Sequence, residues 1–116
     1  MKLDPKEKPT RFYSRQQERQ IAKSLGGQNI LGSGCANFHK GDVLLEEWVI
    51  EAKTRITPQE SISFQKEWLT GVEQERADMK KSYAAVAFSF GDGQNYYAMD
   101  ERTFKFLLAL SRGEIV

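Results

Sequence analysis

The spacing of apolar and polar residues along the chain predicts three helices separated by short strands. Apolar residues three or four positions apart mark segments with one buried helical face, whereas short apolar runs and two-residue alternation mark strands. In chain order the predicted elements are a helix over 15–25, a strand over 28–31, a hairpin over 42–54, a helix over 61–81, strands over 84–90 and 96–100, and a helix over 101–113.

Capping residues define the ends of the first and last helices. Ser14 is a suitable N-cap for the first helix, which Gly26 and Gly27 end. Asp100 is expected to cap the last helix and Gly113 to close it. The order is α-β-β-β-α-β-β-α, and the helix between the third and fourth strands allows a crossover. The sequence therefore predicts an α/β fold with a mixed central β-sheet flanked by helices.

Charge is distributed unevenly along a chain whose net charge is only +1. Residues 1–25 carry seven basic and three acidic groups, whereas residues 26–53 carry two basic and four acidic groups. A basic segment attracts phosphates and clustered carboxylates attract a cation, although a solvated helix face has a similar composition. We expect a flexible basic arm over 1–13, either a solubilising tail or a DNA clamp, and a single domain over 14–116.

Three features of the composition narrow the function. Cys35 is the only cysteine, which excludes an internal disulfide and a cysteine-cluster zinc site. His39 is the only histidine, which argues against a histidine-based zinc centre and a serine triad. Apolar runs stay well short of the about 20 residues of a membrane span, and the N-terminal segment lacks the apolar core of a signal peptide. We therefore expect a cytoplasmic protein without a membrane partner.

The stretch WVIEAKT, residues 48–54, carries an acid and a base two positions apart. Alternation places Glu51 and Lys53 on the same face of a strand, so they form either a solvated ion pair at a sheet edge or part of a cleft. In the predicted hairpin, Asp42 faces a position close to Glu51. Two adjacent carboxylates repel, and a bound Mg²⁺ or Mn²⁺ removes that cost. The ammonium group of Lys53 can then hold or polarise a water for attack on phosphorus.

The order of these residues resembles that of the PD-(D/E)xK nuclease superfamily. Glu18 lies along the margin of the buried stripe of the first helix, a loop containing "GSG" follows, and "GD" at 41–42 precedes "EAK" at 51–53. The closer likeness is to small archaeal-type and phage Holliday junction resolvases, over about residues 14–90. Gly41 departs from the pattern, because the family has proline there. The resemblance implies a restriction-endonuclease-like fold.

The resemblance also implies roles for individual residues. Asp42 and Glu51 would ligate the metal, and the carbonyl group of Ala52 would be a further ligand. Lys53 would be the catalytic lysine. Glu18 would complete the site through a water or a second metal. The implied cofactor is Mg²⁺, with Mn²⁺ as a substitute.

Further residues are expected to meet DNA near this site. Ser33 matches the family's loop serine near the scissile phosphate, although with its flanking glycines it could equally shape a turn. Lys40, beside His39, is either a phosphate contact or a solvated loop residue. Trp68 is interpreted as a core or dimer-interface residue in preference to a base-stacking platform. The predicted DNA contacts are Arg11, Arg15, Arg19, Lys40 and Gln65.

The sequence thus predicts a metal-dependent endonuclease that hydrolyses phosphodiesters of branched DNA. A four-way junction presents two related strands, so a two-fold homodimer is expected, with the helices over 61–81 and 101–113 as candidate interfaces. The short chain suggests a phage or prophage origin, with action in the host cell. The alternatives are another nuclease of this superfamily, of nicking, flap or repair type, and a catalytically silent DNA-binding module. A silent module would be expected to have lost one of the acids.

Overall fold

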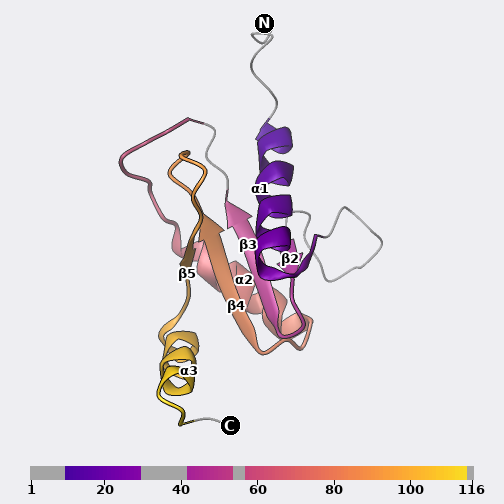
Figure 1. The fold of residues 1–116 in the computed structure, drawn as a ribbon, viewed down its shortest axis with the longest axis vertical. Helices are drawn as coiled ribbons and strands as arrows, with labels where there is room; N and C mark the ends of the chain where they lie inside the picture. Colours follow the sequence, from indigo (N-terminus) through magenta and orange to yellow (C-terminus); the bar gives the residue numbers. More distant parts are fainter. Residues whose placement is uncertain (1–9, 30–41, 54–56, 115–116) are drawn as a thin grey trace, which may run out of the picture.

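The computed structural model describes residues 10–29, 42–53 and 57–114. The helices and strands follow the predicted order α-β-β-β-α-β-β-α (Figure 1), which confirms the α/β class. In chain order they are α1 (Thr10–Leu25), β1 (Gln28–Asn29), β2 (Asp42–Leu44), β3 (Trp48–Lys53), α2 (Lys66–Asp78), β4 (Tyr83–Phe88), β5 (Tyr96–Ala98) and α3 (Glu101–Ser111).

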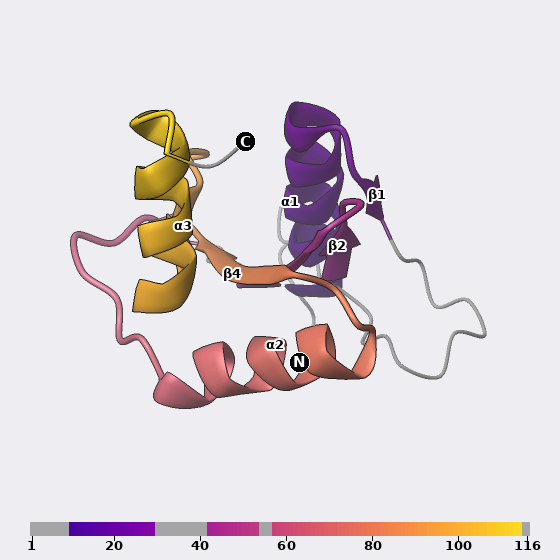
Figure 2. The ribbon, with the colours of Figure 1, turned by 90° about the horizontal axis from the view of Figure 1, so that it is seen from below.

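The strands form one open, mixed sheet in the order β1-β2-β3-β4-β5. The β3–β4 pair is parallel, and the other pairs are antiparallel. A parallel pair requires a crossover connection, which α2 supplies. Helix α2 covers one face of the sheet, while α1 and α3 lie on the other (Figure 2). Because β2 and β4 flank it, β3 is a central strand, and an ion pair at a sheet edge is excluded for Glu51 and Lys53.

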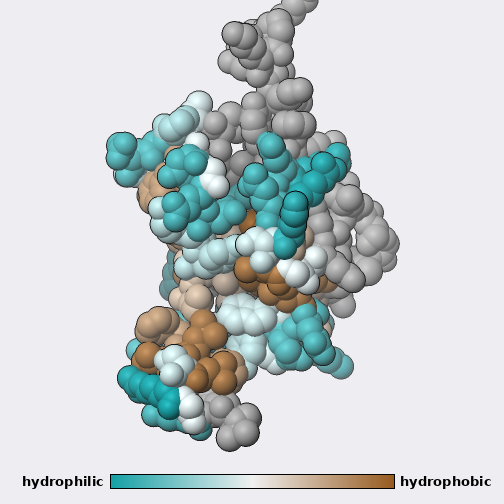
Figure 3. Space-filling view, viewed as in Figure 1, coloured by the Kyte–Doolittle hydropathy of each residue, from teal (hydrophilic) through white to brown (hydrophobic). Residues whose placement is uncertain are grey.

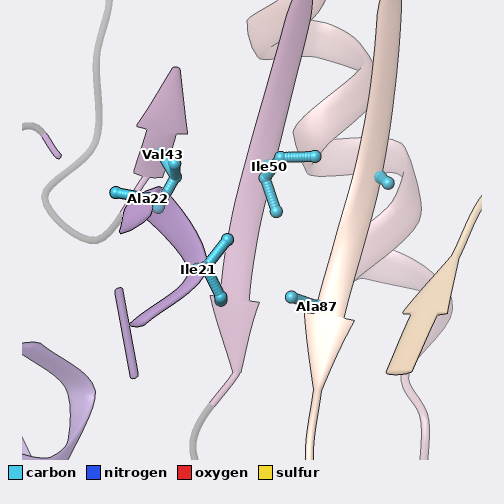
Figure 4. Packing of buried hydrophobic residues seen from close by; sticks show 6 residues of the cluster. Ile21, Ala22, Val43, Ile50 and Ala87 are labelled. Atoms are coloured by element: carbon cyan, nitrogen blue, oxygen red, sulfur yellow. The ribbon is translucent and has the colours of Figure 1, made fainter. Parts of the chain in front are cut away.

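Alternate residues of the central strands pack into two hydrophobic clusters, one on each face of the sheet. The cluster beneath α1 contains Ile21, Ala22, Val43, Ile50, Ala85 and Ala87 (Figure 4). The cluster beneath α2 contains Val49, Val72, Ala84 and Val86. Successive strand residues point to opposite faces. Asp42, Glu51 and Lys53 therefore face α2, because Val43 and Ile50 face α1.

Helix α1 begins five residues earlier than the predicted start at residue 15. It starts at Thr10, so Ser14 lies inside the helix and the expected N-cap at Ser14 is wrong. The physical reason is that residues 10–13 contain neither glycine nor proline, so nothing stops the helix from extending to Thr10. Pro9 is the first residue upstream that disfavours a longer helix. Residues 1–9, which make up most of the predicted arm, lie outside the described residues.

Helix α2 is shorter at both ends than the predicted 61–81. Its N-cap is Gln65, whose backbone is extended at φ −92° and ψ 135°. Ser61 and Ser63 favour non-helical conformations, so the helix does not begin at residue 61. Just before them, the backbone N–H of Gln59 donates to Phe90 O at 2.8 Å, a bond outside any helix. At the other end, the left-handed backbone of Lys80, φ 57°, prevents the helix from continuing.

The hairpin and the C-terminal helix form close to the predicted positions. Leu45 N donates to Trp48 O at 3.0 Å and closes the turn between β2 and β3. Asp100 caps α3 as predicted, since its carboxylate accepts from Thr103 N at 2.8 Å. Gly113, with φ 71°, ends this helix in the left-handed region that favours glycine. The ends of β4 and β5 differ from prediction by one or two residues.

Helix α3 leaves much of its apolar surface exposed. Phe104 is 56% exposed and Leu110 is 42% exposed, and apolar residues gather over this helix at the lower left of Figure 3. Its contact with the rest of the domain includes Phe106, whose ring stacks on Tyr83 with 4.6 Å between the centroids. The dimer interface predicted here stays a prediction. Within the described residues, no helix is both long enough and apolar enough to cross a membrane.

Candidate active site

The β2–β3 register brings together the two acids that the hairpin was predicted to pair. Asp42 lies directly opposite Glu51, followed by Val43 opposite Ile50. Asp42 is 1% exposed, so its carboxyl group is almost completely shielded from solvent. The prediction that Asp42 pairs with a position at or next to Glu51 across the hairpin is confirmed.

Lys53 completes this face of the central strand. Its Nζ atom lies 3.2 Å from Oε1 of Glu51, and the two side chains are 33% and 20% exposed. The same ammonium group lies 5.3 Å from the centroid of the Trp68 ring on α2. A carboxylate and an aromatic ring therefore hold the lysine at the rim of the site, where it is partly open to solvent.

Glu75 is a buried acid of the site that the sequence analysis missed. It lies on α2, is 6% exposed and contacts Asp42. Burial raises the pKa of the Glu75 carboxyl, hydrogen bonding to Asp42 lowers it, and the charge of Glu51 raises it. A signal was present: Trp68, Val72 and Glu75 follow i, i+4, i+7 spacing, so Glu75 occupies a position on the buried stripe of its helix.

Glu18 approaches Asp42 from α1. It is buried, whereas the sequence placed it along the margin of the buried stripe. Burial raises the pKa of its carboxyl; Arg15 and Arg19 oppose this effect, and the charge of Asp42 adds to it. Glu18 is thus close enough to Asp42 for their charges to interact, and its predicted role in a metal site stays a prediction.

Gln17 is a second buried polar residue that the sequence analysis missed. Its Nε2 donates to the backbone O of Lys53 at 3.2 Å and to Oδ1 of Asn95 at 3.0 Å. The side chain therefore ties α1 to the end of β3 and to the segment before β5. One turn before Ile21, it occupies a position that helical spacing would assign to the buried face, but its polarity hid that signal.

The remaining predicted site residues are distributed around this centre. Ala52 lies in β3, opposite Ala87 of β4. Arg15 and Arg19 are exposed on α1, and Gln65 is exposed at the start of α2. Ser33 and Lys40 lie outside the described residues. Arg11 belongs to α1, but its side chain is outside the described part.

The donors of this site suit a hard divalent cation. Carboxylates of Asp42 and Glu51 are oxygen ligands, and Oε2 of Glu51 is buried without a hydrogen-bond partner among the described residues. In the described ranges, no set of three or more Asp, Glu, His or Cys side chains is arranged to hold a metal ion. Mg²⁺ commonly takes only one or two protein carboxylates and completes its shell with waters and substrate phosphates. The two facing carboxylates therefore fit Mg²⁺.

Comparisons with known proteins identify no relative. The chain matches no protein-family model, no curated protein and no solved structure.

The buried Glu75 carboxyl should make the protein less stable as pH rises. Its pKa is raised in the folded state, so stability is lost as pH increases from 4.5, the ordinary pKa of a glutamate carboxyl, through the raised pKa of the folded protein. Glu75→Gln removes this titration and keeps a hydrogen-bonding side chain. We expect its midpoint of thermal unfolding at pH 7.5 to rise by about 4 °C, the shift that about 1 kcal/mol produces in a domain between about 100 and 150 residues long.

Circular dichroism melts at a series of pH values measure this effect. The gain from Glu75→Gln should shrink as pH falls and disappear below about pH 4.5. Glu67→Gln removes the same charge from an exposed position of the same helix and is the matched control. An equal gain from both variants, or a gain that does not change with pH, would contradict the assignment.

Proposed function

We propose that the protein is a Mg²⁺-dependent DNA endonuclease of the PD-(D/E)xK type with a restriction-endonuclease-like fold. One observation carries the proposal: Asp42 and Glu51 face each other in the central hairpin, and Lys53 extends from the same strand face. The mixed sheet with helices on both faces is compatible with that fold. Glu18, close to Asp42, further supports it.

The proposed mechanism assigns one task to each side chain. Asp42 and Glu51 would hold Mg²⁺, with the backbone carbonyl of Ala52 as a further donor. Mg²⁺ supplies positive charge that stabilises the phosphate and makes water a stronger nucleophile. Lys53 would orient the attacking water and offset the charge that develops on the phosphate oxygens. Glu18 would complete the site next to Asp42.

Two exposed arginines on α1 would bind the phosphates of DNA near the acids of the candidate site. Arg15 and Arg19 flank Glu18 in sequence, are exposed, and act electrostatically on its carboxyl. Exposed guanidinium groups bind phosphates and position a duplex without reading its sequence. The two arginines would therefore hold the backbone of DNA close to the buried acids.

Branched DNA is the proposed substrate, and a homodimer is the proposed assembly. The symmetric cutting of a four-way junction requires two sites related by a two-fold axis. Helix α3 is the candidate interface, since Phe104 and Leu110 expose large apolar side chains. In such a dimer each protomer would cut one of two equivalent strands.

Cleavage of a labelled four-way junction, compared with a linear duplex of the same sequence, tests the proposal. Paired incisions near the crossover that require Mg²⁺ or Mn²⁺ and stop in EDTA are the expected result. Equal cutting of junction, flap, nicked and linear DNA would point to another nuclease of the superfamily. Binding without cutting in either metal would contradict the endonuclease and favour a silent DNA-binding module.

A further inference from the structure

A pocket of about 310 Å³ adjoins the candidate active site on the α2 side of the sheet. It opens where β3 and β4 end and α2 begins, and Lys53 and Phe88 are paired there as the last residues of their strands. Ligands in open α/β sheets commonly bind beyond the carboxyl ends of parallel strands. Its lining includes Lys53, Ser63, Gln65, Trp68, Phe88 and Ser89.

Trp68 and Phe88 are the aromatic residues that line this pocket, and they form its aromatic wall. Phe64 contacts both Trp68 and Phe88, with 4.8 Å and 5.6 Å between ring centroids. Both pairs are T-shaped, with interplanar angles of 65° and 79°, so neither pair is stacked face to face. Phe64 is itself partly exposed and supports the Trp68 and Phe88 rings through these two contacts. A flat apolar ring is the kind of ligand that such a wall accommodates.

Polar side chains also line the pocket, namely those of Ser63, Gln65 and Ser89. The Gln65 side chain is exposed and makes no capping hydrogen bond to α2, so its amide can both donate to and accept from a ligand. Ser63 adds an exposed hydroxyl group. Ser89 is buried, and its Oγ accepts from Gly91 N at 3.0 Å, which holds this lining hydroxyl in place.

Lys53 belongs to both the pocket and the candidate active site. Its ammonium group lies 3.2 Å from Glu51 and 5.3 Å from the Trp68 ring centroid. A phosphate held at Lys53 would therefore place the adjoining sugar and base next to the aromatic wall. One nucleotide combines these features, because its base is flat and carries donors and acceptors while its phosphate is anionic.

We propose that this pocket binds an unstacked nucleobase of the strand whose phosphate lies at Lys53. The proposal rests on the proposed nuclease function and adds a base-binding subsite to it. The base stacks on the Trp68 and Phe88 side, and the Gln65 amide meets its edge. Unpaired or weakly stacked bases, as at a strand crossover, enter at lower cost than bases inside a duplex. The pocket thus favours branched over linear DNA.

Tryptophan fluorescence tests the stacking directly, because the chain has only two tryptophans. Trp48 packs near Tyr83 at 5.0 Å between ring centroids and belongs to the α1 face, so it is the internal control. In Trp48→Phe, four-way junction DNA in EDTA should quench the remaining Trp68 emission. In Trp68→Phe, the same DNA should leave Trp48 emission unchanged. Anisotropy of a dye-labelled junction measures binding in parallel.

A junction that lacks one base tests the same contact between the base and Trp68. A junction with one abasic nucleotide beside the incision point should bind wild-type protein about 5- to 150-fold more weakly than the intact junction, as expected for one stacked base. Trp68→Leu should bind both junctions equally, and Trp68→Phe should restore much of the discrimination. Circular dichroism of both variants checks that the fold is retained. Gln65→Ala, at an exposed position, should weaken the same discrimination.

The outcomes separate the pocket from the nuclease. Quenching of Trp68 together with abasic discrimination supports the pocket even if the protein does not cut. Bound DNA without either signal overturns the pocket and leaves the nuclease standing. Absence of DNA binding by the intact protein overturns both.

Discussion

Asp42→Asn should abolish junction cleavage while leaving DNA binding nearly intact. The variant replaces the buried carboxyl group that lies opposite Glu51 with an amide and so removes the proposed Mg²⁺ ligand. The cleavage rate should fall by about 10³-fold or more, which corresponds to about 4 kcal/mol of transition-state stabilisation. Single-turnover cleavage of a labelled four-way junction at saturating protein measures the loss. Binding should persist, since an amide near the phosphates cannot repel them.

Asp92→Asn is the matched control for this variant. Asp92 is exposed in the turn before β5, where its Oδ1 accepts from Gln94 N at 3.1 Å. An asparagine oxygen accepts the same hydrogen bond, so the control changes charge without changing structure. It should cleave at the wild-type rate. Full cleavage by Asp42→Asn would rule out the assigned site.

Lys53→Ala should lower cleavage by about 10²–10³-fold, the usual cost of removing one group that stabilises a transition state. Its ammonium group lies at the partly exposed rim of the site, held by Glu51 and the Trp68 ring. That position suits a group that meets water and phosphate during the reaction. Junction binding measured by anisotropy should change little, because a single phosphate contact contributes modestly to total affinity. Lys53→Ala should therefore lower the single-turnover rate constant for cleavage and leave the affinity for the junction nearly unchanged.

Lys105→Ala controls for the loss of one positive charge. Lys105 is exposed on α3, away from the α2 face of the sheet. It should leave the single-turnover rate unchanged. A fall in binding that accounts for the whole effect of Lys53→Ala would show that this lysine only binds DNA. Wild-type cleavage by Lys53→Ala would remove it from the proposed mechanism altogether.

The sequence predicts the hairpin part of the site well because its information is local. Strand alternation places Glu51 and Lys53 on one face, and a turn between β2 and β3 sets Asp42 opposite Glu51. Both inferences need only neighbouring residues. The N-cap at Asp100 is predictable for the same reason, since its bond to Thr103 N stays within one turn.

The sequence does not predict the contributions that depend on tertiary packing. Glu75 contacts Asp42 only because α2 crosses over the sheet, and no spacing rule gives that contact. Gln17 reaches Lys53 and Asn95 across 36 and 78 residues of chain. The start of α1 at Thr10 was missed for a different reason, because a plausible cap at Ser14 concealed a longer helix.

The Asp42–Glu51 pair and the hydrogen bonds of Gln17 also differ in the order in which they can form during folding. Closing the short hairpin between Asp42 and Glu51 costs little chain entropy, so this acid pair can form from local chain alone. The bonds from Gln17 join distant parts of the chain and require α1 to be docked on a finished sheet. We therefore expect the acid pair to form early in folding, and the hydrogen bonds that anchor the strand carrying Lys53 to form late.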